Sequence, residues 1–168
     1  MIYCLDTNTL IHSWRFWYTR RTHPSLWEAF LALAATGALK IPLQVYEELE
    51  EREDALFDWC KRHKAMLVFE PTASTEAQYR VLANEYPALT GGLGLKQDYA
   101  DLYVVAVAMV EGATVVTHED IGFRRDPNRR SRSQKNYKIT NVCFEKGVEL
   151  IRIYEVLRRQ GWVFRHGA

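Results

Sequence analysis

Seven carboxylates of this sequence lie close to the ends of short apolar segments. They are Asp6, Glu47, Glu48, Asp98, Asp101, Glu119 and Asp120. Asp6 ends an apolar stretch and Asp101 precedes a run of nine apolar residues, so burial of both is expected. Because an unpaired buried carboxylate is costly and clustered carboxylates repel one another, such acids usually surround a cation. Mg²⁺ and Mn²⁺ prefer oxygen ligands and activate water against a phosphodiester. The pattern predicts a divalent-metal site capable of hydrolysis.

Each acid taken singly also has an ordinary structural explanation. Asp6 and Asp98 could cap helices, because an Asp side chain accepts hydrogen bonds from the first amides of a helix. Glu47 and Glu48 could lie on a solvated helix face, and Asp120 could be a turn residue. The sequence alone leaves these alternatives open.

The acids must be positioned by short strands and longer helices. Strands are expected at 2–5, 40–42, 66–69, 113–117 and either 138–143 or 148–151, and helices at 7–18, 25–36, 44–52, 54–64, 75–86, 98–111 and 154–159. Wholly apolar strands that alternate with helices favour a parallel sheet covered on both faces. The prediction is an α/β fold: a three-layer α/β/α sandwich with a mostly parallel sheet of four to five strands. Ligands of such sheets bind beyond the carboxyl ends of the strands, where several of the acids fall.

Composition narrows the class of protein. The chain has 168 residues, of which 48% are hydrophobic and 26% charged, and one domain over 1–168 is expected. The longest apolar run, Leu102–Val110, is far shorter than the roughly 20 residues of a membrane span, and no signal peptide is expected. Three scattered cysteines argue against a disulfide framework or a thiolate zinc site, so a cytoplasmic location is expected. The sequence has neither a phosphate-binding P-loop nor an HExxH zinc motif.

Charge is distributed unevenly along the chain although the net charge is only +1. One segment, 124–138, carries seven basic residues against the single acid Asp126: Arg124, Arg125, Arg129, Arg130, Arg132, Lys135 and Lys138. Such a basic insert attracts polyanions, because binding to phosphates releases condensed counterions. A solvated surface loop is the alternative.

Four segments resemble, in order, the four motifs of PIN domains. Asp6-Thr7-Asn8 resembles the first, Glu48-Leu49 the second and Ala100-Asp101 the third. Thr117-His118-Glu119 resembles the fourth, usually T-x-D, except that Glu119 stands at the aspartate position and Asp120 follows it. The first helix and the segments 45–49 and 139–143 further resemble the DUF4411 group of bacterial PIN-like proteins.

This resemblance implies a metal-dependent endoribonuclease that cleaves single-stranded or loop RNA by a metal-activated water, with Mg²⁺ or Mn²⁺ as cofactor. Many such proteins are VapC-like toxins of toxin–antitoxin pairs, so an antitoxin partner is expected. The implied catalytic metal ligands are Asp6, Glu48, Asp101 and Glu119, with Asp120 and Asp98 as further candidate ligands. Asn8 and Thr117 would orient ligands or water. Attack by water predicts a 5′-phosphate and a 3′-hydroxyl.

The basic insert is longer than a minimal PIN domain needs. The expected RNA-binding residues are Arg124, Arg125, Arg129, Arg130, Arg132 and Lys135. An acidic protein partner is the other candidate for this segment.

Other functions remain open at the level of sequence. A catalytically degenerate domain that only binds RNA or protein is the main alternative, since Glu119 departs from the motif. A haloacid dehalogenase-like phosphatase is disfavoured because Asn8 stands where its second aspartate is needed. A DNA-directed nuclease is possible, since the preference for RNA rests on the family resemblance.

The first helix is unusually aromatic and has three candidate roles. It carries Trp14, Phe16, Trp17 and Tyr18. Aromatic residues at helical spacing usually belong to the core. They could instead form a homodimer or antitoxin contact, or stack on nucleic-acid bases.

Overall fold

A central parallel sheet organises the protein. The computed structural model describes residues 1–90, 99–119 and 137–164. Within them the sheet has five strands in the order β3-β2-β1-β4-β5, and every neighbouring pair is parallel. The strands are β1 (Tyr3–Leu5), β2 (Leu39–Pro42), β3 (Val68–Phe69), β4 (Thr114–Val116) and β5 (Leu150–Ile151). The expected α/β fold with a parallel sheet of up to five strands is confirmed.

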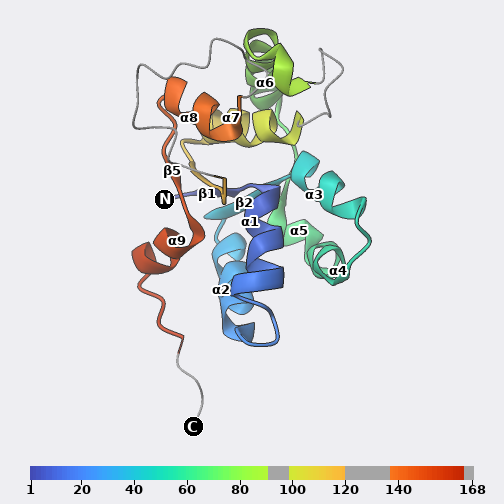
Figure 1. Ribbon diagram of the computed structural model, residues 1–168, viewed down its shortest axis with the longest axis vertical. Coiled ribbons are helices and arrows are strands. Elements are labelled where there is room, and N and C mark those ends of the chain that lie inside the picture. Colours follow the sequence, from blue (N-terminus) through green and yellow to red (C-terminus); the bar gives the residue numbers. More distant parts are fainter. Residues whose placement is uncertain (91–98, 120–136, 165–168) are drawn as a thin grey trace.

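Helices cover both faces of this sheet. They are α1 (Thr7–His12), α2 (Pro24–Ala35), α3 (Leu43–Glu50), α4 (Ala55–Arg62), α5 (Lys64–Leu67), α6 (Ala73–Glu85), α7 (Tyr99–Glu111), α8 (Ile139–Glu145) and α9 (Ile153–Arg159), with a π-helix η1 (Ser13–Trp17) and a 3₁₀ turn η2 (Pro87–Thr90). Figure 1 shows α6, α7 and α8 on one side of the sheet and α1, α2 and α9 on the other. The three-layer sandwich follows from strands whose side chains are buried on both faces.

The most deeply buried helix is α7. Its residues from Leu102 to Ala108 are all buried, because the helix lies between the sheet and the outer helices α6 and α8. A helix that is apolar on all sides is suited to such a position. On the other side of the sheet, Trp27 packs edge-on against Trp14 at 4.8 Å and Trp59 at 5.0 Å between ring centroids. Trp14 is therefore partly buried and packs against the core.

Two of the expected strands need correction. The segment 138–143 is not a strand: the Lys138 amide donates to Asn141 Oδ1 at 2.9 Å and begins helix α8, so 148–151 contains the fifth strand. The apolar spacing at Ile139, Val142 and Cys143 is the helical i, i+3, i+4 pattern. The expected strand at 66–69 is strand only over Val68–Phe69, since α5 covers the residues before it.

The expected helix over 7–18 changes character after its first six residues. Regular α-helix ends at His12, and a π-helix continues over Ser13–Trp17.

No helix in the described ranges combines the length and hydrophobicity that a bilayer span requires.

Candidate active site

Asp6 stands at the carboxyl end of the central strand β1. It is 2% exposed, and its backbone amide donates to the carbonyl of Val116 at 3.0 Å, which continues the pairing with β4. Although the Asn8 amide at the start of α1 acts to lower the pKa of Asp6, the side chain forms no capping hydrogen bond of standard geometry with α1. Instead Oδ2 of Asp6 accepts a 2.7 Å hydrogen bond from the hydroxyl of Thr117. The residue that follows the neighbouring strand therefore orients this carboxylate.

Hydrogen bonds of Thr117 and Thr9 connect the ends of the two central strands with the first helix. Oγ1 of the fully buried Thr117 also accepts a 3.1 Å hydrogen bond from the amide of Glu119. Oγ1 of Thr9 donates to the carbonyl of Val116 at 3.0 Å. One hydroxyl thus bonds both Asp6 and the backbone of Glu119, which fixes the position of the chain after β4 relative to the end of β1.

Glu48 reaches the same edge of the sheet from α3. Its Oε2 accepts a 2.5 Å hydrogen bond from the hydroxyl of Thr7, the first residue of α1. Glu47 is exposed and accepts a hydrogen bond from Tyr99 at 3.2 Å. Of the two neighbouring acids, the structure places Glu48 at the cavity described next.

One cavity of about 550 Å³ lies at this edge. It is lined by Asp6, Thr7, Asn8, Glu48, Glu51, Arg52, Tyr99, Asp101, Glu119 and Lys138. The structure therefore brings together the four acids matched to the motifs, from the end of β1, α3, the first turn of α7 and the segment after β4. Asp98, Asp120 and the basic residues from Arg124 to Lys135 lie outside the described residues.

Sequence reasoning missed five of the lining residues. They are Thr7, Glu51, Arg52, Tyr99 and Lys138. Glu51 and Arg52 follow Glu48 by three and four positions, a spacing that places residues on one side of a helix and its last turn. Lys138 belongs to the basic segment 124–138, but its approach to Glu119 depends on how α8 packs.

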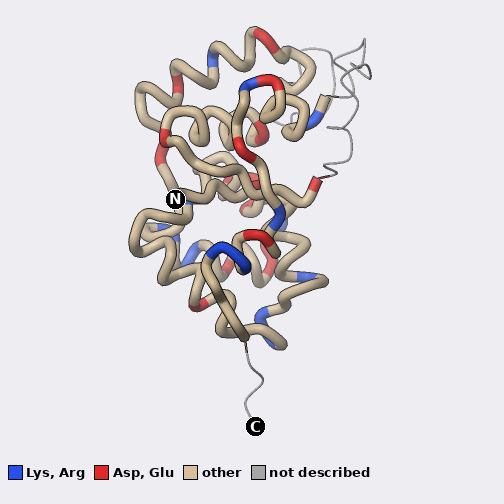
Figure 2. The backbone as a smooth tube through the Cα atoms, turned by 90° about the vertical axis from the view of Figure 1, so that its left-hand side faces the viewer, with Lys and Arg blue, Asp and Glu red and all other residues tan. Residues whose placement is uncertain are grey.

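The electrostatics of the cavity favour a bound cation. Burial, together with the negative charges of Glu119 and Glu48, raises the pKa of Asp6 to about 7, although hydrogen bonds from the Thr117 hydroxyl and the Asn8 amide act in the opposite direction. Lys138 Nζ lies 3.6 Å from Glu119 Oε1. Acidic and basic residues are otherwise interspersed over the described chain (Figure 2), so the excess of carboxylates is a local feature of this cavity.

The donor set suits a hard divalent cation bound with water. All the acids at the cavity offer carboxylate oxygens, the ligands that Mg²⁺ and Mn²⁺ prefer. Among the described residues, no three Asp, Glu, His or Cys side chains come close enough to hold one ion directly. Mg²⁺ commonly binds through one or two carboxylates and keeps several waters, so carboxylates spaced around a roomy cavity fit this mode.

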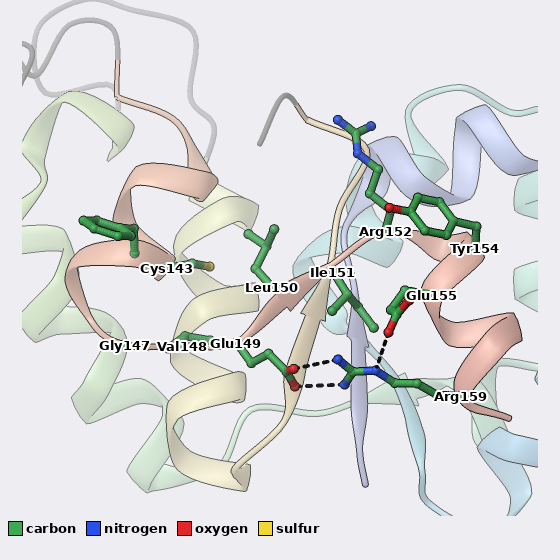
Figure 3. A pocket seen from close by; sticks show the side chains of 11 residues that line it. Cys143, Gly147, Val148, Glu149, Leu150, Ile151, Arg152, Tyr154, Glu155 and Arg159 are labelled. Atoms are coloured by element: carbon green, nitrogen blue, oxygen red, sulfur yellow. Dashed lines mark hydrogen bonds and ion pairs between the residues drawn. The ribbon is translucent and has the colours of Figure 1, made fainter. Parts of the chain in front are cut away.

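A second cavity, of about 650 Å³, lies beside the edge strand β5. Arg159 occupies it and pairs with Glu149 at 2.7 Å and with Glu155 at 3.1 Å (Figure 3). These contacts hold the pKa of Glu149 below its ordinary value, chiefly through the hydrogen bonds from Arg159 and Thr114. Because its acids are already neutralised by an arginine, this cavity lacks the feature that would attract a metal ion.

Comparison with known proteins identifies the family. No curated protein matches the chain. A solved structure, VapBC2 from Rickettsia felis bound to a DNA fragment from the promoter, aligns with 22% identity and a TM-score of 0.47 over 90% of this chain and 98% of that one. The model of the family described as "Domain of unknown function (DUF4411)" matches residues 3–164. Since this match spans nearly the whole sequence, the protein belongs to the DUF4411 family.

Proposed function

We propose that the protein is a divalent-metal-dependent endoribonuclease that hydrolyses phosphodiesters of single-stranded or loop RNA. The observation that carries this proposal is the set of four carboxylates, Asp6, Glu48, Asp101 and Glu119, which four separate segments bring to one cavity. The cavity lies beyond the carboxyl ends of the parallel strands, where α/β proteins bind their ligands. The resemblance of these residues to the PIN motifs supplies the choice of RNA.

The four acids are the proposed site of Mg²⁺ or Mn²⁺, with one or two of them bound to an ion directly and the others through water, and Asp98 and Asp120 are further candidates. A divalent cation, when bound, supplies a Lewis acid that activates water and neutralises charge on the phosphodiester. The protein's own hydroxyls prepare the ligands: Thr117 orients Asp6, and Thr7 orients Glu48. Hydrogen bonds of this kind set the direction and basicity of a metal ligand.

Other residues of the cavity are suited to hold the substrate. Arg52 and Lys138 are the cations among its described lining residues and can bind phosphate oxygens on either side of the scissile bond. Asn8 also lines the cavity and can donate to a phosphate or a water. The insert with Arg124, Arg125, Arg129, Arg130, Arg132 and Lys135 is proposed to extend this electrostatic contact along the RNA.

The biological role proposed is that of a cytoplasmic toxin inhibited by an antitoxin protein. This part rests on the motif resemblance to VapC-like PIN domains. An antitoxin would protect the host cell by covering the cavity or by displacing the metal. The protein expressed alone should slow growth unless Asp6 is replaced, and co-expression with an antitoxin should relieve this inhibition.

A binding module without catalysis is the second candidate. The contact between Glu119 and Lys138 favours it, since a lysine near the fourth acid can take the place of a cation. Such a protein would bind RNA but would not cleave it in the presence of any divalent metal ion.

Incubation of the purified protein with structured and unstructured RNAs tests the proposal. Cleavage is expected with Mn²⁺ or Mg²⁺, no cleavage with EDTA, and none by a folded Asp6→Asn variant. The products should carry 5′-phosphates. A 2′,3′-cyclic phosphate would contradict attack by water, and intact RNA under all conditions would favour the binding module.

A further inference from the structure

Four rings gather beside the acid cavity and form what is here called the aromatic platform: His12, Phe16, Trp17 and His118. The ring centroids of His118 lie 4.3 Å from His12 and 4.1 Å from Trp17, which meets it edge-on at 84°. Phe16 continues the group at 5.6 Å from His12. Residues from the first helical segment and from the end of β4 therefore build one ring-lined surface.

Two members of the platform face solvent. Phe16 is 64% exposed and Trp17 45% exposed, whereas their neighbour Trp14 packs on the buried Trp27. Adjacent exposed aromatic residues mark interaction sites more often than chance, because their apolar area gains from being covered. Both lie in the π-helix, a conformation that is frequent at functional sites.

The platform is continuous with the acid cavity along the chain. His118 stands between Thr117, which bonds Asp6, and Glu119, which lines the cavity. His12 lies five residues after Thr7 on the same helix, about 8 Å along its axis. A group bound on the platform would therefore be a close neighbour of a phosphodiester in the cavity.

Arg152 provides a positive charge at the rim of the platform. Its Nη1 donates to the carbonyl of His118 at 3.1 Å and lies 3.4 Å from Nδ1 of the same residue. Figure 3 shows the side chain directed away from the Glu149–Arg159 ion pair. None of the ion pairs among the described residues involves Arg152, and its guanidinium supplies a positive charge beside His118.

We propose that the aromatic platform stacks an unpaired base of the RNA strand whose phosphodiester enters the acid cavity, with Arg152 binding a phosphate of that strand. Aromatic stacking combined with cationic contacts to the backbone is how proteins bind single strands. The proposal rests on the proposed function for the identity of the nucleic acid. It names the subsite that would restrict the enzyme to unpaired RNA, since a base inside a duplex cannot lie on a protein ring.

Equilibrium binding in EDTA tests the platform without cleavage. The probes are a fluorescein-labelled single-stranded RNA and an abasic strand of the same length, both followed by anisotropy. Trp17→Ala should weaken binding of the RNA by about 5- to 100-fold and leave the abasic strand unchanged. Trp17→Phe should restore most of the affinity, and Arg152→Gln should weaken both strands. Phe144→Ala, a phenylalanine 60% exposed on α8, is the matched control and should bind like the wild type.

Several outcomes would overturn the proposal. They are a wild-type protein that binds neither strand, a Trp17→Ala variant that binds the RNA as tightly as the wild type, or equal losses for the two strands. The second outcome is expected if Phe16 and Trp17 contact a protein partner instead. Should Trp17→Ala fail to fold, Phe16→Ala replaces it with the same expectations. Cleavage in the presence of Mn²⁺ is measured separately. A protein whose binding depends on the bases but that does not cleave RNA would contradict the nuclease function and still support base stacking on the aromatic platform.

Discussion

The hydroxyl of Thr117 donates a 2.7 Å hydrogen bond to the carboxylate of Asp6, 111 positions earlier in the chain. Parallel pairing of β1 with β4 makes this contact, since Leu5 pairs with Val116 and the next residue of each strand leaves the sheet at the same edge. The most buried acid of the proposed metal site is therefore oriented by the partner strand.

Replacement of Thr117 by Val should weaken divalent-metal binding by about 10- to 100-fold, because loss of a hydrogen bond that orients a ligand has this effect. Thr117→Ser keeps the hydroxyl and should bind nearly as tightly as the wild type. Isothermal titration with Mn²⁺ measures both. Equal affinities of the Val variant and the wild type would contradict the orienting role.

The protein should gain thermal stability from Mn²⁺ or Mg²⁺ and lose that gain on addition of EDTA. A ligand that binds only the folded state contributes about 2.7 kcal/mol at a hundred times its Kd. Differential scanning fluorimetry over a Mn²⁺ series gives the shift in Tm. Asp101→Asn should reduce the shift, whereas Asp58→Asn, an exposed acid on α4, should not. A wild-type Tm that does not respond to either metal would favour the binding module.

Asp6→Asn should stabilise the metal-free protein at neutral pH. Burial, together with Glu119 and Glu48, raises the pKa of Asp6 to about 7 in the folded state, compared with about 3.9 in the unfolded state. The ionised carboxylate therefore destabilises the fold above pH 7, and this penalty disappears as the pH falls from about 7 to about 4.

The expected gain for Asp6→Asn is on the order of 1–3 kcal/mol at pH 8, shrinking toward zero at pH 4. Urea unfolding in EDTA at several pH values measures it. A variant that is less stable than the wild type at pH 8 would contradict this prediction. It would show that the ionised carboxylate stabilises the metal-free fold.

The pKa of Asp54 is shifted in the opposite direction to that of Asp6, so the expected pH dependence of stability is also opposite. Its burial acts to raise its pKa, but hydrogen bonds from Arg15 at 2.7 Å and from the amides of Phe57 and Leu56 lower the pKa below its ordinary value. The stability from this helix cap is therefore present above about pH 4 and is lost as the pH falls further. Asp54→Ala should cost about 1 kcal/mol at pH 7 by urea unfolding. A cost that stays constant down to pH 2 would contradict the charged form of the cap.

Some of the architecture is predictable because it depends on local pattern. The all-apolar stretches around Cys4 and Val115 indicate buried parallel strands, and the run after Asp101 indicates a buried helix. The sequence left the fifth strand open between 138–143 and 148–151, because a helical period of three to four is hard to tell from a strand over six residues. The Asn141 side chain that caps helix α8 settled the conformation.

Residue types at fixed spacing along the chain were enough to predict the class of fold and the family and to match four acids to the PIN motifs. The tertiary structure was needed to show that Asp6, Glu48, Asp101 and Glu119 line one cavity and that Thr117 donates a hydrogen bond to Asp6. It also decided which aromatic residues of the first helical segment pack against the core and which are exposed, with Trp14 on Trp27 and Phe16 and Trp17 at the surface. The reason is physical: contacts between residues far apart in sequence arise from strand order and helix packing.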